Sequence, residues 1–251
     1  MDSVLSDLGS YPRRGRALER TVVGGALVFG SVLVIPALVL IGYCVRVAET
    51  TLAGSDDPPE IAPGTWRPLA VTGTAASVIL LVYLVGPLAL GTMLGLVVGA
   101  LGYYGLLGLA PVVADHDTLV WGTSVVAALV AALLALAFVA FTLVVYYHLP
   151  AALARYAETG SLRAAFERKP LVRIATTSEY ALGMAALQLV PLVVPIVAVL
   201  CLVSIVGIVV LPAVPFVAAL VSSRLIAVAV ARSRSADEPS NVSVTRSRGR
   251  V

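Results

Sequence analysis

Four long stretches of this chain consist almost entirely of uncharged, mostly apolar residues. Residues 21–45, 68–114 and 118–147 carry no charged side chain, and residues 174–223 carry one, Glu179. A helix needs roughly 20 apolar residues to cross about 30 Å of hydrocarbon. The first and third stretches are therefore long enough for one membrane-spanning helix each, and the second and fourth for two helices each.

This pattern predicts an all-α fold, an integral membrane helical bundle with about six spans. Helices are the expected spanning elements because hydrocarbon leaves no water to pair with backbone groups. We expect the spans at residues 21–45, 69–89, 91–113, 119–148, 174–197 and 199–223. Residues 21–231 would form the membrane domain, with a polar lead-in at residues 1–20 and a disordered tail at residues 232–251.

Composition supports a lipid-facing surface. Hydrophobic residues make up 59% of the chain and charged residues 12%, against about 25% charged residues in a typical soluble domain. So few polar side chains cannot coat a protein in water. The two cysteines, Cys44 and Cys201, form no CxxC motif, and we expect both to be reduced apolar fillers.

Basic residues predict the orientation of the spans. Of the seventeen basic residues, all but Arg46 and Arg67 lie before the first span, in residues 149–173, or after the last span. Six spans would place those three segments on one side, which the positive-inside rule makes cytoplasmic. Both termini of a multi-pass cell-membrane protein are therefore expected in the cytoplasm, and the acidic loop at residues 46–67 outside.

A second topology stays open for the first stretch. Its glycines and Pro36 would allow residues 21–45 to form a re-entrant hairpin that enters and leaves on the same side. Such backbone is tolerated at membrane depth only where protein buries it. The loop at residues 46–67 would then be cytoplasmic.

A short sequence echo suggests an internal repeat. Arg46–Thr50 and Arg155–Thr159 agree at four of five positions, and each follows a long apolar stretch. With six spans the two copies would lie on opposite sides, so the two three-helix halves would be inverted repeats, as in many secondary transporters. A coincidental or shared amphipathic pattern is the alternative explanation.

Two groups of residues carry a family resemblance. The first group is Gly42, Tyr43, Arg46, Pro59, Trp66 and Gly73, and the second is Tyr147, Pro150, Ala151, Ala157, Phe166, Ser178, Glu179 and Tyr180. With these residues the chain resembles the prokaryotic membrane family called domain of unknown function 4013, frequent in archaea and particularly haloarchaea. The resemblance covers most of residues 10–231 and implies a multi-pass membrane protein without an assigned activity. Acidic residues expected after Trp66 are absent, which leaves the role of the preceding loop open.

Polar residues inside the apolar stretches are the first candidates for function. Glu179 would be a coupling site for protons or ions, or a structural residue at the interface near Arg173. Gln188 lies deeper in the same expected span, where a hydrogen bond to another helix is its expected role. The sequence Asp115-His116-Asp117 is interpreted as a solvated turn, because three adjacent residues cannot all face one metal ion.

Small and basic residues suggest two further contacts. Gly91, Gly95 and Gly99 are spaced by four, which predicts a tight helix-packing seam within the chain or between chains. The segment at residues 149–171 is basic and amphipathic, which predicts contact with anionic lipid headgroups. The basic residues expected to make that contact are Arg155, Arg163, Arg168 and Lys169. No nucleic-acid partner is expected.

Catalytic motifs are absent from the sequence. It contains no G-x-S-x-G, Walker A or G-x-G-x-x-G pattern, so we expect no enzyme and no cofactor. The first function hypothesis is a non-enzymatic structural or interaction module of the envelope, acting with copies of itself or other membrane proteins. The second is a small transporter or permease, which predicts a polar cavity at broken helices near Pro36 and Pro191. The third is a lipid-modifying enzyme, for which only Arg173, Glu179 and Tyr180 form a cluster.

Overall fold

The protein is described by a computed structural model, which defines residues 10–14, 16–61, 63–113, 117–204, 207 and 210–237. These residues form helices, turns and loops, without a strand among them, so the all-α class is confirmed. Five helical segments are long and apolar enough to cross a membrane. They are Val34–Leu52, Trp66–Pro111, Trp121–Thr159, Ser178–Val203 and Ala213–Ser235. The expected sixth span is not found in the described part of the chain.

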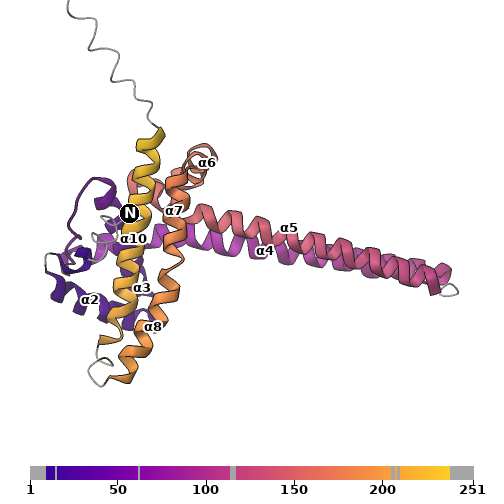
Figure 1. Cartoon of the computed structure of the whole chain (residues 1–251), viewed down its shortest axis with the longest axis horizontal. Coiled ribbons are helices and arrows are strands. Elements are labelled where there is room, and N and C mark those ends of the chain that lie inside the picture. Colours follow the sequence, from indigo (N-terminus) through magenta and orange to yellow (C-terminus); the bar gives the residue numbers. More distant parts are fainter. Residues whose placement is uncertain are drawn as a thin grey trace, which may run out of the picture. The chain divides into compact units, whose positions relative to one another are not determined.

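The chain divides into two compact units. Unit 1 comprises Met1–Ile79 and Pro150–Val251, and unit 2 comprises Leu80–Leu149. The elements in chain order are η1 (Tyr11–Arg13), α2 (Ala17–Gly30), α3 (Val34–Leu52), η2 (Pro63–Thr65), α4 (Trp66–Val113), α5 (Asp117–Thr159), η3 (Arg163–Phe166), α6 (Arg168–Ala175), α7 (Ser178–Leu187), α8 (Val190–Val203) and α10 (Ala213–Asp237). In unit 1, α10 packs along α7, α3 and α2, so the C-terminal helix is the axis of this unit (Figure 1).

The first apolar stretch is broken, and the prediction of one helix over residues 21–45 is wrong. Helix α2 ends at Gly30 and α3 begins at Val34. A tight turn joins them, in which the Leu33 amide donates to the Gly30 carbonyl at 2.8 Å. Pro36 falls in the first turn of α3, where a missing backbone N–H leaves no helical hydrogen bond unmade. Helix α2 has 14 residues, about 21 Å at 1.5 Å per residue, which is too short to cross a bilayer.

The second and fourth stretches also differ from the prediction. Helix α4 runs through Pro87 without a break, so the two spans expected at residues 69–89 and 91–113 are one helix. In the fourth stretch the chain leaves the helix after Val203 and re-enters one at Ala213, later than the boundary expected at residue 198. Helix α10 continues to Asp237, into the segment predicted to be a disordered tail. Residues 1–9 and 238–251 lie outside the described residues.

The core of unit 1 joins both ends of the chain. It is formed by Tyr11, Leu27, Val39, Tyr43, Val47, Leu69, Phe216 and Leu220. The rings of Tyr43 and Phe216 stack at 5.8 Å between centroids, and the Tyr43 hydroxyl donates to the Pro59 carbonyl at 3.0 Å. Five elements, from η1 to α10, therefore share one apolar cluster.

Two glycines let α3 and α4 touch through their backbones. A Cβ added to Gly42 would lie 1.9 Å from the Leu69 carbonyl oxygen, and one added to Gly73 would lie 1.8 Å from the Leu38 carbonyl oxygen. Because no side chain fits at these distances, glycine is required at both positions.

Unit 2 is a helical hairpin with little interior. The part of α4 from Leu80 to Val113 and the part of α5 up to Leu149 are each about 50 Å long at 1.5 Å per residue. The helices meet where Phe138 lies against Gly91, and the Tyr146 hydroxyl donates to the Leu84 carbonyl at 3.4 Å. Most large apolar side chains of this hairpin are exposed, which is the surface that lipid tails solvate and water does not.

Candidate functional site: a basic hollow at the end of α10

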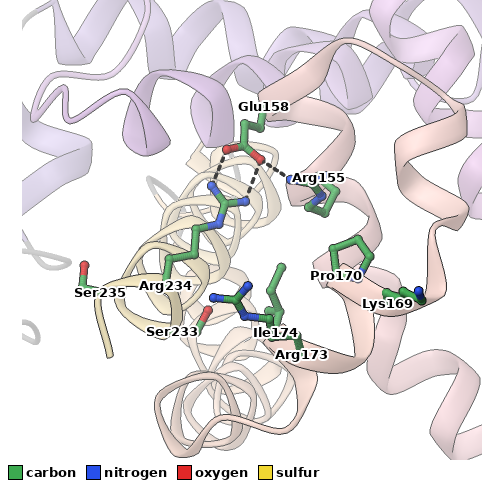
Figure 2. A pocket seen from close by; sticks show the side chains of 9 residues that line it. All are labelled: Arg155, Glu158, Lys169, Pro170, Arg173, Ile174, Ser233, Arg234 and Ser235. Atoms are coloured by element: carbon green, nitrogen blue, oxygen red, sulfur yellow. Dashed lines mark hydrogen bonds and ion pairs between the residues drawn. The ribbon is translucent and has the colours of Figure 1, made fainter. Parts of the chain in front are cut away.

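An open hollow of about 660 Å³ lies in unit 1 beside the C-terminal end of α10. Its walls come from the last turns of α5, from α6 and from α10 (Figure 2). It is lined by Arg155, Glu158, Lys169, Pro170, Arg173, Ile174, Ser233, Arg234 and Ser235. We call this site the basic hollow.

Local sequence explains how α5 and α6 form two of the walls. Helix α5 stops at Thr159, followed by Gly160 in the left-handed region at φ +65°, where glycine carries no steric penalty. Helix α6 is short and amphipathic, with Leu171 and Ile174 buried. Its charged residues Lys169 and Arg173 are exposed and lie about one turn apart along the helix.

Glu158 holds two arginines in the wall. It accepts a hydrogen bond from Nη1 of Arg155 at 2.8 Å. Both terminal nitrogens of Arg234 donate to its two oxygens, one of them at 2.7 Å, in a bidentate pair that joins α5 to α10. A second carboxylate, that of Glu167, lies 3.9 Å from Nη2 of Arg155. The two guanidinium groups are therefore fixed in place by the protein itself.

Among the described residues that line the hollow, cationic side chains outnumber carboxylates. The cations are Arg155, Lys169, Arg173 and Arg234, and the carboxylate is Glu158. Figure 2 shows the Arg173 side chain directed toward α10 near Ser233, whereas Lys169 extends away from α10 on the other side of the hollow. Arrangements of this kind attract anions.

The structure separates the basic residues singled out in the sequence. Arg155 and Lys169 line the hollow, while Arg163 and Arg168 are exposed outside its lining. Sequence reasoning did not join Arg173 and Arg234 to this set. The signal for Arg173 is present in the one-turn spacing from Lys169, but the 76-residue separation of Arg234 from Glu158 leaves no local signal.

The polar residues Glu179 and Gln188 do not converge. Glu179 is half-buried in the first turn of α7, where the helix N-terminus stabilises a carboxylate. The Thr177 hydroxyl caps that helix by accepting from the Tyr180 amide at 3.4 Å. Gln188 is exposed at the C-terminal cap of α7, two and a half turns further and therefore on the opposite side. Tyr180 is fully buried while Arg173 is exposed, so the three residues considered for an enzyme share no open surface.

Of the glycines in the expected packing seam, one packs within the chain. A Cβ on Gly91 would lie 2.2 Å from the Phe138 ring, whereas one on Gly95 or Gly99 would meet no atom of the described residues within 4 Å. The seam between chains stays a prediction for those two positions. Asp115 and His116 lie outside the described residues, within which no group of three or more metal-binding side chains is found.

A second polar cluster ties the N-terminal segment to the loop after α3. Buried Arg224 of α10 lies 3.2 Å from the Asp56 carboxylate, and its guanidinium carbon lies 4.0 Å from the centre of the Tyr11 ring. Arg14 donates to the Asp56 carbonyl at 3.1 Å, and buried Arg20 donates to the Arg14 carbonyl at 3.1 Å. The chain before α2 and the chain after α3 therefore lie side by side.

The echoed segments have the same local structure. Arg46 pairs with Glu49 at 2.9 Å, as Arg155 pairs with Glu158 at 2.8 Å. In both copies the final threonine donates to the arginine carbonyl, at 3.1 and 2.9 Å. Arg224 of α10 holds the loop after the first copy and Arg234 holds the second copy, ten residues further along. That spacing is about 15 Å: Arg224 lies midway along α10 and Arg234 lies near its C-terminal end.

Comparison with known proteins identifies one family. The model for "Protein of unknown function (DUF4013)" matches residues 28–203. No curated protein and no solved structure matches the chain. Several residues that carried the resemblance in the sequence are buried packing residues, among them Tyr43, Ala151, Ala157 and Tyr180.

Proposed function

The chain belongs to the DUF4013 family of proteins of unknown function, and on that premise we propose that it is a non-enzymatic structural or interaction module of the cell envelope. The observation that carries this proposal is the apolar core of unit 1. Aromatic and aliphatic side chains fill it, and α3 and α4 cross in backbone contact at Gly42 and Gly73. Such close packing suits a fixed scaffold.

The other hollows of unit 1 support the same function. One of about 1040 Å³ adjoins the α2–α3 turn, α8 and the start of α10, and one of about 450 Å³ lies between α8 and α10. Apolar residues line both, apart from Thr21 in the smaller. A transporter that binds polar substrates would need polar groups at such places.

For the topology, we propose that α2 and α3 form a re-entrant hairpin with a cytoplasmic entry and exit. The contacts of Arg14 and Arg224 with Asp56 support it, because two ends of one crossing helix would lie a bilayer apart. The large side chains at the tip of the hairpin are apolar and exposed, as expected next to hydrocarbon, while the Ser31 and Leu33 amides of its turn donate to the Val28 and Gly30 carbonyls. Its exposed residues are Phe29, Val32, Leu33, Val34 and Ile35.

Charge supports this topology too. With α4, α5, the α7–α8 pair and α10 crossing the membrane, both termini and residues 46–67 and 149–173 share one side. The basic residues then lie on or next to that side, including Arg46 and Arg67, apart from Arg224, which lies midway along α10 and pairs with Asp56 of the loop on that side. The outer connections, near residues 114–116 and 204–212, carry none. The positive-inside rule makes the shared side cytoplasmic.

Cysteine labelling tests the hairpin. In a chain with Cys44 and Cys201 replaced, single cysteines are introduced at Arg16, Ser55 and Ser204, all exposed. With an impermeant reagent, we expect labelling of Ser204→Cys in intact cells and of Arg16→Cys and Ser55→Cys only after lysis. Labelling of Ser55→Cys from outside would instead support a crossing first stretch and six spans.

A second labelling experiment separates the module from a transporter. Ala76 and Ala227 are fully buried in unit 1, and cysteine is a small replacement at either position. A dry scaffold predicts no reaction with a water-soluble reagent until the protein is denatured, with Ser204→Cys as the reactive control. Reaction in the native membrane would favour the alternative function, a small transporter with inverted halves. The loop after the first copy and the second copy itself contact α10 about 15 Å apart, about half the thickness of the hydrocarbon core, which argues against such inversion.

The proposed partners follow from the exposed surfaces. Anionic headgroups are proposed to contact Arg155, Arg163, Arg168 and Lys169 on the cytoplasmic side. Copies of this chain or other membrane proteins are proposed to pack on the apolar sides of the bundle, including Gly95 and Gly99, which leave room for a close approach.

A further inference from the structure

We infer that the basic hollow is a binding site for a phosphate group, supplied by the headgroup of an anionic phospholipid. The inference rests on the proposed membrane location and deepens it, because it assigns the headgroup contact to a defined site. Arg173 and Arg234, which the sequence did not connect with lipid, belong to that site together with Arg155 and Lys169.

The charged side chains that line the hollow favour an anion. Glu158 receives hydrogen bonds from both Arg155 and Arg234, and Glu167 lies 3.9 Å from Arg155. Among the described residues, four cationic side chains and the Glu158 carboxylate line the hollow. A headgroup with a net negative charge suits such a lining, whereas a zwitterionic headgroup adds a positive charge beside its phosphate.

The protein itself holds two arginines of the hollow in fixed conformations. Glu158 fixes Arg155 and Arg234 through hydrogen bonds from two helices, so little side-chain entropy remains to be lost when an anion binds. Guanidinium groups match the oxygens of phosphate in pairs, and the ammonium of Lys169 adds a point charge. The hollow, at about 660 Å³, has room for a phosphate with its attached headgroup alcohol.

The hollow lies at the ends of apolar helical segments. Three of the apolar helical segments end around the hollow, at Thr159, at Ser178 and at Ser235. Helix α6 turns Leu171 and Ile174 inward and its basic side outward at the same place. The hollow therefore opens where apolar helices give way to polar chain, which is the depth at which a bilayer presents its phosphates. This favours a lipid over a soluble phosphate as the source.

Two charge-matched variants test the site. Lys169→Gln/Arg173→Gln removes two positive charges from the hollow, and Arg16→Gln/Arg67→Gln removes two exposed charges of unit 1 outside it. Binding of phosphatidylglycerol and of phosphatidylcholine to the full-length protein in detergent is measured by native mass spectrometry. We expect phosphatidylglycerol to bind preferentially, the hollow variant to lose about tenfold or more in affinity, and the control to stay within about twofold of wild type. Arg173→Lys keeps the charge without the planar fork, so an intermediate loss is expected.

Inorganic phosphate distinguishes the two sources of the ligand. If millimolar phosphate leaves bound phosphatidylglycerol in place, the site takes the lipid. If phosphate displaces the lipid, and its own binding is lost in the hollow variant, the phosphate site stands but a soluble ligand replaces the lipid assignment. Equal losses in both variants, or no preference for phosphatidylglycerol, would overturn the inference. Labelling of Ala227→Cys reports on the proposed scaffold independently, since it does not depend on lipid binding.

Discussion

Unit 1 and unit 2 both contain long apolar helices but have different interiors. In unit 1, aromatic rings, a glycine crossing and two long-range ion pairs join five or more elements. In unit 2, two long helices lie together with most of their large apolar side chains exposed. Unit 1 is stabilised by contacts within the chain, whereas unit 2 depends on what surrounds it, either lipid tails or other protein.

The glycines give the sharpest test of this difference. Gly42→Leu should destabilise the protein by about 3 kcal/mol, because its side chain would overlap the Leu69 backbone, which cannot move aside without separating α3 from α4. Gly95→Leu in unit 2 should change the stability by less than about 1 kcal/mol, since its side chain enters open space. Thermal unfolding followed by circular dichroism in one detergent compares them. Equal losses would mean that the two units are packed alike.

The two units also differ in charge. Unit 1 buries Arg20 and Arg224, whereas the acidic and basic residues of residues 80–149, histidine aside, are Asp115 and Asp117. Arg224→Met should cost about 2 kcal/mol through loss of the cation–π contact with Tyr11 and the pair with Asp56. The cost stays moderate because Asp56 is 82% exposed and water can solvate it. Arg16→Met, which removes an exposed pair at 3.7 Å, should cost less than about 0.5 kcal/mol. A similar effect of both substitutions in the same melting experiment would contradict an anchoring role for Arg224.

Within unit 2, alanine substitutions at two glycines one turn apart should change the stability in opposite directions. Gly91→Ala brings a methyl group against the Phe138 ring and should cost about 1 kcal/mol, since a ring can shift partly aside. Gly95→Ala should gain up to about 1 kcal/mol from helix propensity alone. Adding Phe138→Leu to Gly91→Ala should recover part of the loss. Hydrogen exchange of the α4 amides measures all three, and a loss at Gly95 equal to that at Gly91 would reveal packing there.

The smallest effect is expected at Glu179. Glu179→Gln keeps the shape of the side chain and removes a charge from the first turn of α7, so unit 1 should lose about 0.5 kcal/mol. The melting temperature in detergent at fixed pH measures this loss. A cost above that of Arg224→Met would instead indicate a buried, specifically paired carboxylate, and would revive the coupling role for this residue.

The sequence predicted the class and the apolar stretches but not where the helices break. Pro36 and Pro191 lie in the first turns of α3 and α8, whereas Pro87 lies in the middle of α4. A proline is harmless in a first turn and costly inside a helix, unless neighbouring structure offsets the lost hydrogen bond. Which case applies depends on tertiary contacts, so the pattern alone suggested a break at residues 86–90 that α4 does not have. The break after Gly30 corresponds to the re-entrant alternative that the glycines and Pro36 left open.

The candidate site was predictable only in part, because local sequence patterns do not encode tertiary contacts. Basic residues of α5 and α6 are close in sequence, and their amphipathic pattern pointed to the headgroup region. The arginines of α10 pair with Glu158 and Asp56 across 76 and 168 residues, and no local pattern encodes such pairs. Hydropathy likewise does not mark the boundary at Ile79, because one uncharged stretch at residues 68–114 runs across it.

The unit 2 helices are longer than the hydrocarbon core of a bilayer is thick, which creates a hydrophobic mismatch. An apolar hairpin about 50 Å long exceeds a 30 Å hydrocarbon core by about 20 Å when upright, and would have to tilt by about 54° to be covered completely. Tilts of membrane helices range up to about 40°. Part of the hairpin must therefore be covered by a locally thickened bilayer or by another protein. Because thicker membranes reduce this mismatch, bilayer thickness itself becomes a variable that sorts the protein among membranes and drives its association.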